Sequence, residues 1–290
     1  MDLRQTWQVI QEAAANWMED NAARMGAALA FYSVLSLAPL LLIALGLAGM
    51  IFDEADARTR LIAQFRELVG KEGSEAIQAM LENGSKTSGT LSTIVGVVTL
   101  LFGASGVFGE LQSAMDAVWD VKPKPVGWLG LLRARFLSFA MVLGTGFLLV
   151  ISLLASTVIA ALQDTAHGWW PQLEPVLRVL SMGLTLVIVT VLFALIYKLL
   201  PDAQVQWTDA WIGALVTAVL FSIGKFAIGL YLGNSGLASG YGAAGSLVVL
   251  IVWIYYSAQI VFFGAEITHA ISSVRTHDLP QPKEHAVPAH

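Results

Sequence analysis

The sequence predicts an all-α membrane protein: a polytopic helix bundle with six transmembrane helices, an N-terminal interfacial helix and an extracytoplasmic helical hairpin. Two observations lead to this prediction. Hydrophobic residues make up 56% of the chain and charged residues only 13%, whereas a soluble domain carries about 25% charged residues. Several apolar stretches are also long enough to cross about 30 Å of hydrocarbon. Because lipid offers the backbone no hydrogen-bond partner, these stretches should be helices.

The chain begins with an amphipathic segment, residues 2–24. Its apolar side chains recur at helical spacing at Leu3, Trp7, Ile10, Ala14 and Trp17. This pattern predicts a helix that lies along the cytoplasmic membrane interface. The segment is mixed polar and acidic, so we do not expect a cleavable signal peptide.

The predicted spans carry few or no charges, and they cover about residues 29–51, 92–108, 136–162, 179–197, 210–232 and 243–265. The first contains Pro39, which removes a backbone hydrogen bond and predicts a kink. The second is the shortest, and its helix is expected to continue through Gly109–Trp119. The fifth contains one charge, Lys225, and the sixth ends at Glu266.

Residues 53–90, between the first two spans, are the predicted hairpin. Apolar residues recur at helical spacing over 55–82, and Gly70 and Gly73 interrupt the pattern. The hairpin could cap the bundle, or its helices could be packed for stability alone. Residues 1–272 are then expected to form a single membrane domain, and residues 273–290, rich in Pro, His and charge, a disordered cytoplasmic tail.

The basic residues between the spans predict the orientation. Nine Lys or Arg lie in the N-terminus, the second and fourth loops and the tail, against one in the third and fifth loops. The first loop adds five on that other side, together with seven acidic residues. The positive-inside rule therefore places both termini in the cytoplasm.

Several classes of function are disfavoured by composition. The chain has no cysteine, which excludes disulfides and thiolate metal sites. Its five histidines form no helical pair, so neither a metal nor another cofactor is expected. The net charge of -5 argues against a nucleic-acid partner.

Four strings of residues together resemble a known family. They are Met25–Leu41; Phe108–Pro123; Tyr197–Asp202 followed by Trp207–Gly213; and Ser239–Ser246 followed by Trp253–Glu266. In this order they resemble the YihY/BrkB family of bacterial inner-membrane proteins, over roughly residues 5–272. The resemblance implies six spans, a plasma-membrane location and an unsettled activity. Family members have been labelled ribonuclease BN, virulence factor, and transporter of lipid or small solute.

Lys225 is the strongest single indication of function. A lysine near the centre of a span costs about 2.5–3.5 kcal/mol on insertion scales, so it should face protein or water. Its long stem could instead reach the outer membrane surface. Polar residues at the end of the fifth span, in the outer loop and along the sixth span extend this candidate substrate path, which comprises Lys225, Tyr231, Tyr241, Ser246, Tyr255 and Gln259. The polar residues of the sixth span could line a cavity or form interhelical hydrogen bonds.

A second candidate site is a cytoplasmic charge cluster of Arg24, Glu110, Arg133, Arg135 and Glu266. Helix depth puts Glu266 on the order of 20 Å from Lys225, which argues against a direct pair. We expect a structural ion pair between Glu266 and Arg24. Glu110 and Asp116 are expected to cap the bundle rather than to act as an acid–base pair. Glycines such as Gly103, Gly106 and Gly109 are interpreted as helix-packing positions.

Three functional hypotheses follow. The first is a transporter or flippase of a small solute or anionic lipid, with membrane lipids as its surroundings. The second is a non-transporting membrane scaffold or envelope-assembly factor. The third and weakest is a ribonuclease, since such an enzyme needs converging metal ligands and a basic channel. The prediction is therefore a protein that is not an enzyme, and its small-residue faces would permit a homo-oligomer.

Overall fold

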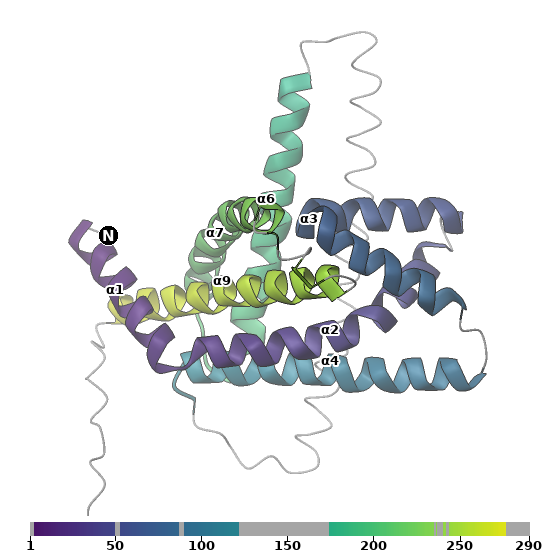
Figure 1. Cartoon of the computed structure of the whole chain (residues 1–290). Coiled ribbons are helices and arrows are strands. Elements are labelled where there is room, and N and C mark those ends of the chain that lie inside the picture. The colour runs from purple at the N-terminus through teal and green to yellow at the C-terminus, as the bar shows by residue number, and fades with distance from the viewer. Residues whose placement is uncertain are drawn as a thin grey trace, which may run out of the picture.

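The computed structural model describes residues 3–49, 53–86, 90–121, 174–234, 236, 240–241 and 244–276. The helices with defined bounds are α1 (Leu3–Glu19), α2 (Ala22–Ala48), α3 (Glu54–Lys86), α4 (Thr90–Val118), α6 (Glu174–Leu199), α7 (Trp207–Asn234) and α9 (Gly245–Thr276), shown in Figure 1. No strand occurs in this part of the chain. The all-α prediction is confirmed for these residues.

Four of the described helices contain segments long and apolar enough to cross a membrane. These segments are Ala22–Leu42 in α2, Met182–Leu199 in α6, Trp207–Leu232 in α7 and Gly245–Arg275 in α9. They correspond to the first, fourth, fifth and sixth predicted spans. The second predicted span lies in α4, which runs on to Val118 as expected. The third, residues 136–162, lies outside the described residues, so a total of six spans stays a prediction.

The sixth helix is longer than predicted. Glu266 was expected to mark its end, yet α9 continues to Thr276. The reason is that α1 covers this extension: Val9 and Ala13 pack against Ile267, Ala270 and Ile271 of α9. Figure 1 shows α1 beside the last turns of α9. The predicted boundary of the tail at residue 273 is therefore wrong, because residues 273–276 are helical.

A tight turn separates α1 from α2. Asn21 has a φ of 56°, the left-handed region that asparagine tolerates better than most residues. Its side-chain Nδ2 donates to the carbonyl oxygen of Glu19 at 3.1 Å. The helix axis changes direction here, so α1 can lie against α9 while α2 enters the bundle. The α2 helix then continues through Pro39.

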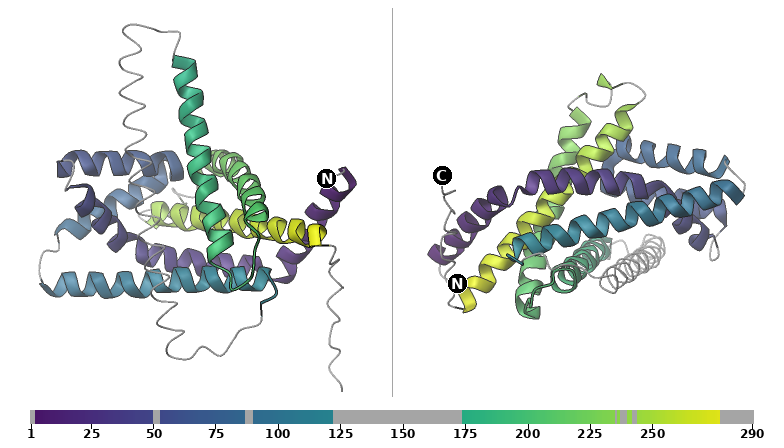
Figure 2. Two further views of the ribbon diagram at one scale, coloured as in Figure 1. Left: turned by 180° about the vertical axis from the view of Figure 1, so that it is seen from behind. Right: turned by 90° about the horizontal axis from the view of Figure 1, so that it is seen from below.

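The break predicted near Gly70 and Gly73 is absent from the described part of the hairpin, residues 53–86. Instead α3 is helical from Glu54 to Lys86, and Figures 1 and 2 show its ribbon bending within its length. Its buried residues, among them Ala57, Ile77 and Leu81, pack with Leu41 of α2 and Leu250 of α9. The apolar pattern was therefore interpreted correctly as a packing face, while an arrangement as two separate helices is not confirmed.

The helices are arranged as an α2–α4–α9 layer crossed by α6. Helices α2, α4 and α9 lie side by side, and α6 passes across them with its N-terminal part standing clear of the other described helices (Figures 1 and 2). The largest buried cluster lies where α6, α7 and α9 meet α2 and α4, and it includes Met115, Tyr197 and Phe262. This junction positions the candidate site.

Candidate functional site

Helices α7 and α9 are interlocked by two glycine–threonine contacts. A Cβ added to Gly213 of α7 would lie 1.7 Å from Oγ1 of Thr268 in α9. A Cβ added to Gly264 of α9 would lie 1.9 Å from Oγ1 of Thr217 in α7. Each glycine is thus needed for the close approach of the opposing threonine, as in small-residue packing of membrane helices. The two contacts also fix an antiparallel register between the helices.

A buried hydroxyl joins α6 to this pair. Tyr197 of α6 is fully buried, and its OH donates to the backbone carbonyl oxygen of Val261 in α9 at 2.8 Å. The same oxygen lies 2.9 Å from Oγ1 of Thr217 in α7. Thr217 in turn can donate to the carbonyl oxygen of Gly213 at 2.7 Å. We call Tyr197, Thr217 and Val261 the hydroxyl node.

An aromatic layer lies next to the hydroxyl node. The rings of Phe193 and Tyr197 are stacked, with centroids 6.3 Å apart. Phe193 meets Phe221 of α7 edge to face at 5.8 Å, and Phe221 meets Trp253 of α9 in the same way at 6.1 Å. We call Phe193, Phe221 and Trp253 the aromatic layer. It fills the space between α6, α7 and α9 one turn beyond the node.

Lys225 lies one helical turn beyond the aromatic layer. It follows Phe221 by one i to i+4 step on α7, so the two share a helix face. Its side chain is half-buried, whereas that of the adjacent Phe226 is 70% exposed. Lys225 has no hydrogen-bond or ion-pair partner among the described residues. The structure therefore places an ammonium group at the edge of the junction, on the side away from the hydroxyl node.

The other residues of the candidate path do not all converge on Lys225. Tyr231 and Tyr241 are exposed, and Ser246 is half-buried. Tyr255 and Gln259 lie on the side of α9 that faces α2. There Nε2 of Gln259 donates to the carbonyl oxygen of Ala22 at 3.2 Å. For Gln259, the structure thus favours interhelical hydrogen bonding over cavity lining.

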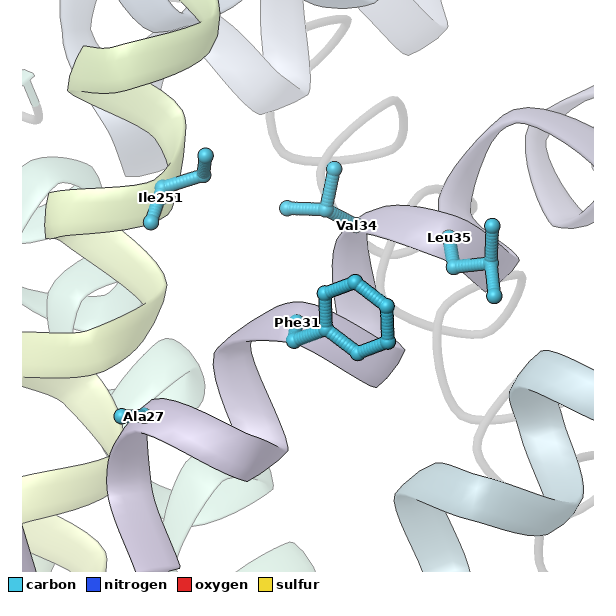
Figure 3. Close-up of a pocket in the computed structure, with 5 residues that line it drawn as sticks. All are labelled: Ala27, Phe31, Val34, Leu35 and Ile251. Atoms are coloured by element: carbon cyan, nitrogen blue, oxygen red, sulfur yellow. The ribbon is translucent and has the colours of Figure 1, made fainter. Parts of the chain in front are cut away.

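An apolar groove runs between α2 and α9 (Figure 3). Its volume is about 210 Å³, and it is lined by Ala27, Phe31, Val34, Leu35 and Ile251. None of these residues belongs to the predicted path. The lining offers no charge or hydrogen-bonding side chain, so the groove suits hydrocarbon rather than a polar solute.

The predicted charge cluster is only partly brought together. Arg24 is exposed, Glu110 is half-buried and Glu266 is 1% exposed, while Arg133 and Arg135 lie outside the described residues. No ion pair between Arg24 and Glu266 is present in the described part of the chain. The expected pairing of these two residues is not supported, because Arg24 points to the surface and Glu266 into the bundle.

The ion pair observed at this end joins Asp209 to Arg275 at 2.7 Å. Asp209 is in the first turn of α7 and is 1% exposed, while Arg275 is in the last turn of α9 and is 48% exposed. Each charge complements the dipole of its own helix end. Sequence reasoning missed this pair, although both helix-end positions could have suggested it.

The turn between α6 and α7 is fixed at the same end of the bundle. Asp116 of α4 accepts a hydrogen bond from the backbone N–H of Asp202 at 2.7 Å. Lys198 donates to the carbonyl oxygen of Val205, and its Nζ lies 5.7 Å from the ring centroid of Trp207. Asp116 thus caps the bundle, as predicted.

The described residues contain no group of three or more His, Asp or Glu that could hold a metal.

Comparison with known proteins connects this architecture to a family. The Virulence factor BrkB family model matches residues 13–288. A UPF0761 membrane protein of Rhodospirillum centenum is 28% identical over 281 residues, which are 94% of this chain and 59% of that protein. A UPF0761 membrane protein of Pseudomonas paraeruginosa is 29% identical over 93% of this chain and 64% of its own length. One from Vibrio vulnificus is 26% identical over 87% of this chain and 78% of its own.

The chain therefore spans about three fifths of the length of the first two relatives, which are longer proteins. No solved structure matches the chain.

Proposed function

Because the chain belongs to the Virulence factor BrkB family of membrane proteins, we propose that it moves a small solute or an anionic lipid across the bacterial inner membrane. The observation that supports this proposal is Lys225. Its ammonium is half-buried on the spanning helix α7 and has no acidic partner among the described residues. Placing a cation at such depth is costly unless it meets water, protein or an anion.

The chemistry of Lys225 favours an anionic substrate. An unpaired ammonium attracts phosphate or carboxylate, and the attraction grows where water is scarce. The positive-inside rule puts the Lys225 end of α7 toward the outer side of the membrane. A substrate would then meet Lys225 from that side, with both chain termini in the cytoplasm.

A membrane scaffold is the second candidate. The interlocked glycine–threonine contacts between α7 and α9 favour it, because they are typical of a rigid bundle. The ribonuclease hypothesis draws no support from the junction. Its described polar groups include the hydroxyls of Tyr197 and Thr217, which are engaged with neighbouring helices, and the buried carboxylate of Glu266, which belongs to no described group of three or more His, Asp or Glu that could hold a metal. We therefore propose no enzymatic activity.

Single-cysteine labelling separates a transporter from a scaffold, and the chain provides a cysteine-free background. Lys225→Cys is compared with Phe226→Cys, its outward-facing neighbour. An impermeant maleimide is applied to intact cells and to inverted vesicles. A hydrated path predicts labelling of Lys225→Cys from the outside and protection of Phe226→Cys, because a thiol in lipid stays protonated and unreactive. Equal protection of both from both sides would contradict the transporter proposal and favour the scaffold.

Two exposed positions serve as controls for orientation. Gln206 lies just before α7, and Tyr241 lies between α7 and α9. Gln206→Cys should be labelled only in inverted vesicles and Tyr241→Cys only in intact cells. The reverse result would show that the predicted orientation is inverted.

Reconstitution tests the preference for anions. Proteoliposomes containing fluorescent phosphatidylglycerol or phosphatidylcholine are treated with an impermeant quencher to follow transbilayer movement. We expect faster movement of the anionic lipid, and we expect Lys225→Gln to lose this preference while Lys225→Arg retains it. If neither lipid moves faster than in protein-free vesicles, a flippase is ruled out and small anionic solutes are tested next.

A further inference from the structure

Among the described helices, α6 packs against its neighbours through its C-terminal half. Phe193, Ala194 and Tyr197 are buried against α7 and α9, whereas Val179 and Met182 nearer the start of α6 are exposed. Figures 1 and 2 show the same asymmetry: α6 crosses the bundle in its C-terminal half, and its N-terminal part stands clear of the other described helices. A helix held at one end can move about that end more easily than one packed along its length.

The hydrogen bonds from this end of α6 to both partner helices converge on one oxygen. The hydroxyl of Tyr197 bonds to the carbonyl oxygen of Val261 in α9 and lies within bonding distance of Thr217 in α7. Both partners keep another bond if the tyrosine leaves. Thr217 can donate to Gly213, and the Val261 carbonyl belongs to the ladder of α9. Release of Tyr197 therefore leaves no polar group of this node on α7 or α9 without a hydrogen bond.

The aromatic layer would move with the tyrosine. Phe193 lies one turn before Tyr197 on α6 and stacks on its ring. Phe221 and Trp253 belong to α7 and α9, which the glycine–threonine contacts hold together. If α6 withdraws, Phe193 leaves the layer while Phe221 and Trp253 stay. The space beside Lys225 then opens toward the hydroxyl node.

We propose that Tyr197 is a latch that closes the path of Lys225 toward the cytoplasm. With the latch closed, the hydroxyl node and the aromatic layer separate Lys225 from the end of the bundle that carries Asp209 and Arg275. When the latch is released, water and solutes from that end of the bundle can reach Lys225. The inference rests on the transport role proposed above, because only a transporter needs access from both sides.

The test uses Lys225→Cys as the probe and inverted vesicles to present the cytoplasmic side. Tyr197→Phe removes the latch oxygen and keeps the ring in the aromatic stack. We expect the maleimide to label the probe about tenfold faster from the cytoplasmic side in Tyr197→Phe than with Tyr197 intact. Tyr32→Phe is the matched control, since Tyr32 lies in the contact of α2 with Gly106 of α4, outside both the node and the candidate path. It should leave the rate unchanged.

A second variant covers the case in which Tyr197→Phe fails to fold. Thr217→Val removes the partner oxygen on α7 while Tyr197 keeps its bond to Val261, and it should give a smaller increase in the same direction. If either variant folds, as judged by its elution and melting temperature, and labelling does not rise, the latch is refuted. The transport proposal survives that result provided the probe is labelled from the outside. Protection of the probe from both sides in every variant contradicts both proposals.

Discussion

Replacing Gly213 by alanine is the sharpest test of the packing between α7 and α9. The new methyl group would lie 1.7 Å from Oγ1 of Thr268 and 2.7 Å from its Cβ. Rotation of the threonine side chain moves Oγ1 but leaves Cβ in place. The clash therefore remains in every rotamer and must be relieved by separating the two helices.

The expected change in the free energy of unfolding is the sum of two opposing contributions. Overpacking a well-packed interface costs about 1–3 kcal/mol, and occasionally more. Alanine gains up to about 1 kcal/mol over glycine in helix propensity, which offsets part of that cost. Gly229, on the same helix, measures the helix-propensity contribution alone, because a Cβ there would meet no described atom within 4 Å. Gly213→Ala should therefore be about 1–3 kcal/mol less stable than Gly229→Ala, and up to about 2 kcal/mol less stable than the unsubstituted protein, while Gly229→Ala leaves the free energy of unfolding unchanged or raises it.

The free energy of unfolding is measured by denaturant titration of the purified protein in detergent micelles, followed by circular dichroism. The double variant Gly213→Ala/Thr268→Ala should recover part of the loss, because it removes Oγ1 but keeps the threonine Cβ position. If Gly213→Ala proves as stable as Gly229→Ala, the close approach of α7 and α9 described here is incorrect.

Substitutions at three further positions can be measured in the same assay. Gly26→Ala should cost about 0.5–1.5 kcal/mol, less than Gly213→Ala, because its nearest neighbour is the flexible amide of Gln259 at 2.0 Å; a larger loss would mean that this amide cannot move. Arg275→Gln leaves the buried carboxylate of Asp209 without its observed ion pair. It should cost about 1–2 kcal/mol, below the value for a fully buried pair because the arginine is half-exposed; no loss would mean that water replaces the arginine. Asn21→Val should cost about 1–2 kcal/mol at a φ of 56°, whereas Asn21→Gly should be tolerated.

The positions of the spans were predictable because lipid imposes a simple requirement. A long apolar stretch with few charges must satisfy its own backbone, and segments of α2, α6, α7 and α9 all meet that description. The end of α9 was not predictable in the same way. Glu266 would end a helix exposed to lipid, but α1 packs over Ile267 and Ala270, and the helix continues beneath it.

Glycine packing was predicted in part. A Cβ on Gly103 would meet Ser36, and one on Gly106 would meet Tyr32, so both glycines serve the contact between α4 and α2 as expected. Gly109 has no described atom within 4 Å of its added Cβ, so it does not serve a contact between the described helices. The contacts of Gly213 and Gly264 were missed because they depend on the register of two helices. Their signal was nevertheless present: each glycine precedes a threonine by four residues, a small-residue repeat.

The candidate site was predictable where charge was involved and not elsewhere. Lys225 is the one basic residue inside a predicted span, and the free-energy cost of placing an ammonium group in lipid makes it a candidate functional residue. Tyr197 gives no comparable signal, because tyrosine near the end of a span is usually an interface residue. Only the packing of α6, α7 and α9 shows its hydroxyl to be buried and bonded to two helices.

The register of α7 against α9, fixed by the two glycine–threonine contacts, also explains why Glu266 is not the partner of Lys225. Glu266 lies between Gly264 and Thr268 of α9, and these two face Thr217 and Gly213 of α7. Glu266 is therefore level with the stretch of α7 that ends at Thr217. Lys225 lies two further helical turns along α7, about 12 Å beyond Thr217 along the helix axis. The aromatic layer occupies that interval, so neither side chain can reach the other without displacing it. A counter-charge for Lys225 would accordingly have to come from its own side of the layer, the side on which the proposed anionic substrate would bind.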